Sequence, residues 1–209
     1  MSDCCNSPCA SQKPVVDARY RRVLTVALLV NLAMFIVEIM AGSAAGSSAL
    51  LADALDFLGD AANYGISLYV LGHALIWRAR AALLKGLTMA AFGLWVMMTT
   101  LYGVMQGGVP EAATMGVISA LALLVNVGVA LMLYRYRTGD SNMQAVWLCS
   151  RNDAIGNIAV MIAAVGVWLT ASHWPDAIVA FGMACLALTA AVQVITRALQ
   201  ELREERVQP

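Results

Sequence analysis

Six apolar segments make up most of this chain of 209 residues. They run over residues 22–42, 48–74, 82–106, 112–134, 143–171 and 175–199, and breaks with glycine, proline or charged residues separate them at 42–46, 78–85, 107–110, 135–140 and 172–176. Each segment is close to the roughly 20 residues that a helix needs to cross a bilayer. Backbone groups find no water inside lipid, and such uniformly apolar segments are too long for barrel strands. The pattern therefore predicts an all-α, polytopic membrane protein with a bundle of six transmembrane helices.

The composition and the placement of the basic residues agree with this prediction. Hydrophobic residues make up 61% of the chain and charged residues 12%, which is too apolar for a soluble domain. Lys and Arg occur before the first segment, between the second and third, between the fourth and fifth, and after the sixth, whereas the other three connections contain none. Because basic loops stay on the cytoplasmic side, both termini should be cytoplasmic. We expect a multi-pass protein of a bacterial inner membrane, surrounded by lipid and without a nucleic-acid partner.

Polar residues inside the apolar segments lie in stripes along the predicted helices. The stripes consist of Asp53, Asp56 and Asp60 in the second segment, Cys149, Asp153 and Asn157 in the fifth, and Asn31 with Glu38 in the first. Their spacing of three, four or seven residues puts the members of a stripe on one helix face. Charged side chains at membrane depth are costly and mark functional sites. We expect a polar internal cavity; the alternative is that these groups only hydrogen-bond neighbouring helices and hold the bundle together.

Two pairs within these stripes have the chemistry of a metal site. Asp56 and Asp60 are four residues apart, as are Cys149 and Asp153, so each pair can reach a common ion from one helix. Four carboxylate and thiolate ligands on two facing helices suit a tetrahedral divalent transition metal. Crowded in a low-dielectric cavity, the empty ligands cannot all be ionised, so metal binding would expel protons and reprotonation would expel the metal. This chemistry predicts exchange of a metal ion for protons.

The same residues resemble a known family. Asn31, Glu38 and Gly42, the run Ser48-Ala-Leu-Leu-Ala-Asp-Ala-Leu-Asp56 with Asp60, and the later Cys149-x-x-x-Asp153-Ala-Ile-Gly-Asn are similar to the cation diffusion facilitators, which are divalent-metal/proton antiporters. The resemblance implies six membrane helices, cytoplasmic termini and a tetrahedral site made by two residues of the second helix and two of the fifth. It also implies export of zinc or cadmium, with cobalt and nickel as further substrates, in exchange for protons. Apart from the transported Zn²⁺ or Cd²⁺ and protons, we expect no cofactor.

One of the four ligand positions departs from the family pattern. Asp56, Asp60 and Asp153 match it, whereas Cys149 stands where the family usually has His. A thiolate would keep the ligand and favour softer ions such as cadmium. Alternatively, Cys149 is a small buried filler and three carboxylates with water hold the metal. We favour ligation by Cys149.

We expect the chain to be organised as a short form of that family. Residues 1–20 are predicted to be a cytoplasmic tail, residues 21–202 a six-helix transmembrane transport domain and residues 203–209 a short cytoplasmic tail, without the family's usual C-terminal cytoplasmic domain. That domain supports dimerisation in relatives, so a homodimer here would have to rest on helix packing. Gly103 and Gly107, spaced as Gly-x-x-x-Gly, are the candidate motif for it.

Further polar residues are candidates for accessory roles. Asp53 could be an additional ligand, a proton relay or the partner of Arg151, which lies inside the fifth segment. Glu38, Asn31 and Asn157 could line the cavity and hydrogen-bond the ligands. The sequence leaves these possibilities open.

Cysteines and histidines outside the stripes are weaker candidates for metal ligands. Cys4, Cys5 and Cys9 would be reduced in the cytoplasm, and either form a loose site for a soft metal or belong to an unstructured tail. His73 and His173 lie near segment ends, where we expect ordinary interfacial positions rather than metal ligation.

Two other functions could place acidic residues in such a cavity. In an intramembrane aspartyl protease, two Asp residues on different helices share a proton and activate water, but the sequences before Asp60 and Asp153 do not complete that enzyme's motifs. A proton-coupled exporter of organic cations would not explain why the candidate ligands form two pairs. We therefore expect a transporter rather than an enzyme.

Overall fold

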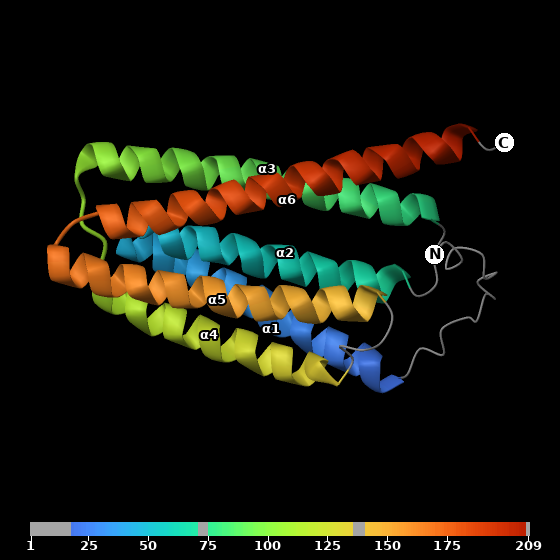
Figure 1. Cartoon of the computed structure of the whole chain (residues 1–209), viewed down its shortest axis with the longest axis horizontal. Helices are drawn as coiled ribbons and strands as arrows, with labels where there is room; N and C mark the ends of the chain where they lie inside the picture. The colour runs from blue at the N-terminus through green and yellow to red at the C-terminus, as the bar shows by residue number, and fades with distance from the viewer. Residues whose placement is uncertain (1–17, 71–74, 136–140, 208–209) are drawn as a thin grey trace, which may run out of the picture.

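Six α-helices form the bundle that the apolar pattern predicts, and none of the described residues lies in a strand. In this computed structural model the described residues are 18–70, 75–135 and 141–207, with side chains described outside 70, 75–78, 141–152, 197, 201 and 204–207. The helices are α1 (Ala18–Ala45), α2 (Ser48–Val70), α3 (Leu75–Gln106), α4 (Ala112–Tyr134), α5 (Ser141–Thr170) and α6 (Trp174–Val207). They run roughly alongside one another in Figure 1. The prediction of an all-α polytopic membrane protein is confirmed.

Lipid contact explains which helix faces are apolar. Among the described residues, five helices are long and apolar enough to cross a membrane. The sixth, α2, is long enough with 23 residues but carries three aspartates. Large apolar side chains such as Leu29, Met98 and Leu124 point outward, as expected where lipid is the solvent. In contrast, residues 47–55 at the start of α2 are buried throughout. The polar helix is therefore the one that its neighbours surround.

The helices pack mainly as three pairs. The most extensive contacts join α1 to α2, α4 to α5 and α3 to α6, and α2 also contacts every other helix. The first residue of α1 and the last residue of α6 lie at the same end of the bundle (Figure 1), as an even number of crossings requires. We call this the basic end, because the described arginines Arg19, Arg21, Arg22, Arg80, Arg135 and Arg203 flank helices there. The opposite end is called the outer end below.

Two predicted helix boundaries at the basic end are wrong. Residues 78–85 were expected to break the chain, but α3 begins at Leu75 and continues through them, and α6 runs to Val207 rather than Leu199. Arg, Lys, Ala, Leu and Glu are good helix formers, so a charged stretch can leave the lipid without leaving the helix. The charged stretch therefore does not mark the beginning or the end of a helix here.

At the outer end, three helices end on a residue with left-handed backbone. Gly46 follows α1 with φ 65°, Gly107 follows α3 with φ 68° and Ala171 follows α5 with φ 46°. Their amides, or that of the next residue, bond back to the helix: Gly107 N to Gly103 O at 3.1 Å and Ser47 N to Gly42 O at 3.0 Å. These bonds close the helix ends in the usual left-handed manner. They make the connections at this end short and tightly turned.

Glycines of α3 serve contacts within the chain. A Cβ at Gly103 would lie 2.9 Å from Cε1 of His173, so the ring occupies the space that a side chain would fill. Gly107, with its positive φ, ends the helix. Both glycines of the candidate dimer motif thus have intrachain roles, and the homodimer stays a prediction.

Close packing of α3 on α6 leads to a testable prediction. A Cβ at Gly86 would lie 2.7 Å from Cγ1 and 3.3 Å from the backbone nitrogen of Ile195, whereas nothing lies within 4 Å of a Cβ at Gly182 on α6. We expect Gly86→Ala to lower the free energy of unfolding in detergent by about 1–3 kcal/mol, as overpacking does. Gly182→Ala is the matched control and should be neutral or slightly stabilising. Equal melting temperatures for the two variants would show that this contact is not tight.

Candidate metal centre

The aspartates of α2 lie in the middle of the bundle. Asp53 is 1% and Asp60 6% exposed, and Asp56 is half-buried. Because α2 contacts all the other helices, its stripe can be reached from α1 and α5 at the same time. The aspartate stripe of α2 therefore faces the interior of the bundle, and the predicted polar cavity stays a prediction.

Asp60 is the most connected of these carboxyl groups. Its Oδ2 accepts a hydrogen bond of 2.8 Å from the hydroxyl of Tyr64, one turn further along α2. The Asp60 side chain also lies within hydrogen-bonding reach of Asp153 of α5. Two carboxyl groups share a hydrogen bond only when one of them carries a proton. Two of the four predicted ligands, from different helices, are thus brought together.

A positive charge reaches Asp60 from α3. Asn63 hydrogen-bonds Asp60, and its Oδ1 accepts a hydrogen bond from Nζ of Lys85. The ammonium also interacts electrostatically with Asp60. A polar chain therefore runs from α3 through Asn63 and Asp60 to Asp153 on α5. The helical spacing of the α2 stripe continues to Asn63, whereas Lys85 was expected only to lie in the break at residues 78–85.

The other two predicted ligands complete the site less fully. Asp56 lies close enough to interact electrostatically with Asp60 and Asp153. Cys149 stands one turn before Asp153 on α5, but its side chain is outside the described part. Within the described part, no three or more His, Cys, Asp or Glu side chains form a group that could hold a metal ion. The four-ligand site remains a prediction in which Asp60 and Asp153 are already neighbours.

A second pair of carboxyl groups joins α1 to α2. Glu38 is fully buried, and its side chain lies within hydrogen-bonding reach of Asp53. Among the described residues, no N–H or O–H donor reaches either oxygen of Glu38 or Oδ2 of Asp53. As with the first pair, a hydrogen bond between them requires a proton on one carboxyl. This arrangement favours the proton-relay role among the roles left open for Asp53.

The two predicted accessory amides differ in their surroundings. Asn31 donates from Nδ2 to the carbonyl of Ala27 in its own helix at 2.8 Å, as a structural asparagine does. Asn157 is fully buried one turn after Asp153, and neither of its amide atoms has a hydrogen-bond partner in the described structure. The side chain of Arg151, His73, and the tail with Cys4, Cys5 and Cys9 lie outside the described residues.

The comparison with known families decides the class of protein. The family model for the cation efflux transmembrane domain matches residues 24–80 and 77–203. The chain belongs to the cation efflux family. Proteins of this family transport metal cations and are not enzymes, and the resemblance noted from the sequence is confirmed. No curated protein matches the chain.

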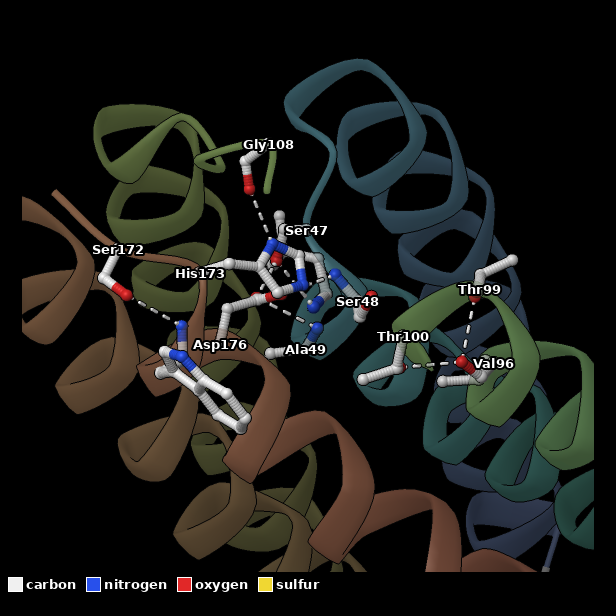
Figure 2. Close-up of polar contacts among 12 residues, drawn as sticks. Ser47, Ser48, Ala49, Val96, Thr99, Thr100, Gly108, Ser172, His173 and Asp176 are labelled. Carbon is white, nitrogen blue, oxygen red and sulfur yellow. Dashed lines mark hydrogen bonds and ion pairs between the residues drawn. The ribbon is translucent and has the colours of Figure 1, made fainter. Parts of the chain in front are cut away.

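This cation efflux protein has a second buried polar cluster, which the sequence did not predict. At the outer end, the carboxylate of Asp176 in α6 points at the start of α2 (Figure 2). It accepts hydrogen bonds from Ser47 Oγ at 2.6 Å, Ser48 N at 2.8 Å and Ala49 N at 3.1 Å. Nε2 of His173 lies 3.9 Å from Asp176 Oδ2. The only signal in the sequence was an Asp in the first turn of a helix, which says nothing of a partner 129 residues away.

His173 is held within this cluster rather than at an exposed interface. Its ring is 8% exposed, and Nδ1 lies 2.9 Å from the carbonyl oxygen of Gly108 between α3 and α4. A carbonyl only accepts, so Nδ1 carries the hydrogen. The expectation of an ordinary interfacial histidine was right about its place near a helix end and wrong about its surroundings.

The Tyr64 hydroxyl gives a prediction about stability. Tyr64→Phe removes the O–H donor to Asp60 and keeps the buried ring, so an acceptor loses its partner in a dry environment. We expect the free energy of unfolding in detergent to fall by about 1–3 kcal/mol. Tyr102→Phe is the control, because that exposed hydroxyl only accepts a bond from Gln106, and it should change stability by less than about 0.5 kcal/mol. Equal melting temperatures for Tyr64→Phe and Tyr102→Phe would show that the Tyr64 hydroxyl does not stabilise the structure through Asp60.

Proposed function

We propose that this protein exports zinc or cadmium from the cytoplasm in exchange for protons, through a site between α2 and α5. The observation that carries the proposal is the Asp60–Asp153 pair, in which carboxyl groups of two different helices meet inside an apolar bundle. Such a pair is costly at membrane depth and is kept where an ion or a proton uses it. Membership of the cation efflux family supplies the class of substrate.

The proposed ligands are Asp56 and Asp60 from α2 with Cys149 and Asp153 from α5. Each pair is spaced by one helical turn, so both members can reach one ion from the same side. Closure around a dication would require Asp60 and Asp153 to give up their shared proton, because only deprotonated ligands bind the metal. Four anionic ligands of mixed carboxylate and thiolate type suit Zn²⁺ and Cd²⁺ better than Mg²⁺ or Ca²⁺.

Proton coupling follows from the same pairs. Asp60 with Asp153, and Glu38 with Asp53, are carboxyl pairs that need a proton to hydrogen-bond. Metal loading from the cytoplasm would release protons from the first pair to that side, and the second pair, two turns nearer the outer end of α2 at Asp53, would carry protons in from the outer side. Reprotonation from the outer side would then expel the metal. The basic end of the bundle, with its exposed arginines, is the cytoplasmic end in this proposal.

An aspartyl-protease function is less well supported. The approach of the Asp60 and Asp153 carboxyl groups is what a catalytic pair of that class would show. The cation efflux family consists of transporters, so the pair is better explained as half of a metal site.

The proposal is tested by transport in reconstituted vesicles. We expect the parent protein to move Zn²⁺ against an imposed proton gradient with matching proton release. Asp60→Asn and Asp153→Asn keep the side-chain volume but remove an anionic ligand, and should each lower the initial rate by about 100-fold, as loss of a metal ligand or its support does. Glu111→Gln, at an exposed carboxylate at the outer end, is the control and should transport normally. Full transport by both Asn variants would rule out this site.

Metal preference tests the role of Cys149. Replacing the thiolate with imidazole exchanges a soft ligand for a borderline one. We expect Cys149→His to shift the ratio of cadmium to zinc transport toward zinc by about tenfold, and Cys149→Ser to lower transport of both. Competition between the two ions in the same vesicles measures the ratio. An unchanged ratio would mean that Cys149 does not bind the metal.

A further inference from the structure

The start of α2 has a complete set of hydrogen bonds, and half of them come from α6. The first amides of a helix have no partner in their own helix, and here residues 48–51 are buried away from water. Leu51 N bonds Ser47 O at 3.3 Å and Leu50 N bonds Ser47 Oγ at 3.1 Å. Ser48 N and Ala49 N bond the two oxygens of Asp176. Asp176 therefore caps a helix to which it does not belong.

The surroundings of Asp176 hold its carboxylate in place. Ser47 Oγ donates to it at 2.6 Å, and the ring of His173 lies on the side of Oδ2. That ring is itself fixed by the Gly108 carbonyl and by the space at Gly103. Asp176 thus contacts the start of α2, and the His173 ring beside it contacts Gly108 in the connection between α3 and α4 (Figure 2). A negative charge at a helix N-terminus is also favoured by the helix dipole.

A shift at this point would reach the proposed metal site. Asp56 follows Ala49 by seven residues, about 10 Å along the helix axis. No proline lies between Ser48 and Asp60, and α2 continues unbroken through Gly59, so we expect a displacement at the start of α2 to be carried along the helix. Metal–ligand distances tolerate only about 0.2 Å of variation, so a small translation or rotation of α2 changes how Asp56 and Asp60 meet α5.

We propose that Asp176 is a positioning residue for the transport site: by capping α2 from α6, it fixes the height and rotation of the α2 carboxylates against α5. The expected effect of Asp176 on transport rests on the proposed function. The structural part of the inference, the capping of α2 across helices, stands on the four hydrogen bonds of Ser47 and Asp176 at the start of α2.

Transport kinetics separate positioning from simple loss of folded protein. We expect Asp176→Ala to raise the apparent KM for Zn²⁺ by about tenfold, the lower end of the range for residues that support metal ligands. A variant that merely folds less well would lower Vmax and leave KM unchanged. Thr189→Ala is the matched control on α6, because that exposed hydroxyl only bonds the Cys185 carbonyl of its own helix. An unchanged KM in Asp176→Ala would overturn the proposal.

A conservative variant identifies the interaction that matters. Asn caps helices about as well as Asp, but Asp176→Asn keeps only one oxygen acceptor for the α2 amides, because its NH2 group replaces the second oxygen that the carboxylate uses. We therefore expect the KM of Asp176→Asn to lie between that of the parent and that of Asp176→Ala. A KM in Asp176→Ala no higher than in Asp176→Asn would overturn the capping account.

Hydrogen exchange on the metal-free protein provides a readout that does not depend on transport. We expect exchange of the amides over residues 48–55 to become at least about tenfold faster in Asp176→Ala and to stay at the parent rate in Thr189→Ala. Unchanged exchange in Asp176→Ala would overturn the proposal that Asp176 caps α2, whatever the transport measurements show. A parent protein that moves no zinc would instead refute the proposed function, while accelerated exchange would still show that Asp176 caps α2.

Discussion

The cost of placing carboxyl groups inside a lipid-embedded bundle is the constraint that shapes this protein. An unpaired charge at that depth costs several kcal/mol. The described structure lowers this cost in two ways. Glu38 with Asp53, and Asp60 with Asp153, lie carboxyl to carboxyl, so that a shared proton can replace a counter-ion. Asp176 instead binds the exposed amides of a helix start, where the backbone supplies the positive charge.

The same constraint puts α2 at the centre of the bundle. Only a helix surrounded by others can carry three aspartates through the membrane, and α2 is the helix that contacts all the rest. Through it the helix pairs are joined: Glu38 and Asp53 hold α1 to α2, Asp60 and Asp153 connect that pair to α4 and α5, and Asp176 connects it to α3 and α6. An ion bound between α2 and α5 would therefore act where the α1–α2 pair meets the α4–α5 pair.

Periodicity predicted what depends on one helix at a time. The six helices, the stripes on α2 and α5, and the approach of Asp60 to Asp153 follow from spacing and hydrophobicity. Residues that depend on a partner far along the chain were missed. Asp176 and Ser47 are separated by 129 positions, and neither has a neighbour in sequence that hints at the other. The continuation of α3 through residues 78–85 was missed for another reason, since charge marks the membrane surface without ending a helix.

The position of Lys85 bears on how such a site could release its ion. Its ammonium reaches the carboxyl cluster through Asn63, and unit charges a few ångströms apart inside a protein interact by about 4 kcal/mol at an effective dielectric constant of ~20. While the site is empty, this positive charge offsets part of the cost of burying the acidic groups beside it. Once a dication is bound, the same charge repels it. On the proposed function, a cation fixed on α3 therefore lowers the cost of burying the acidic ligands and weakens the binding of the metal ion. A transporter must release its ion, whereas a storage site need not.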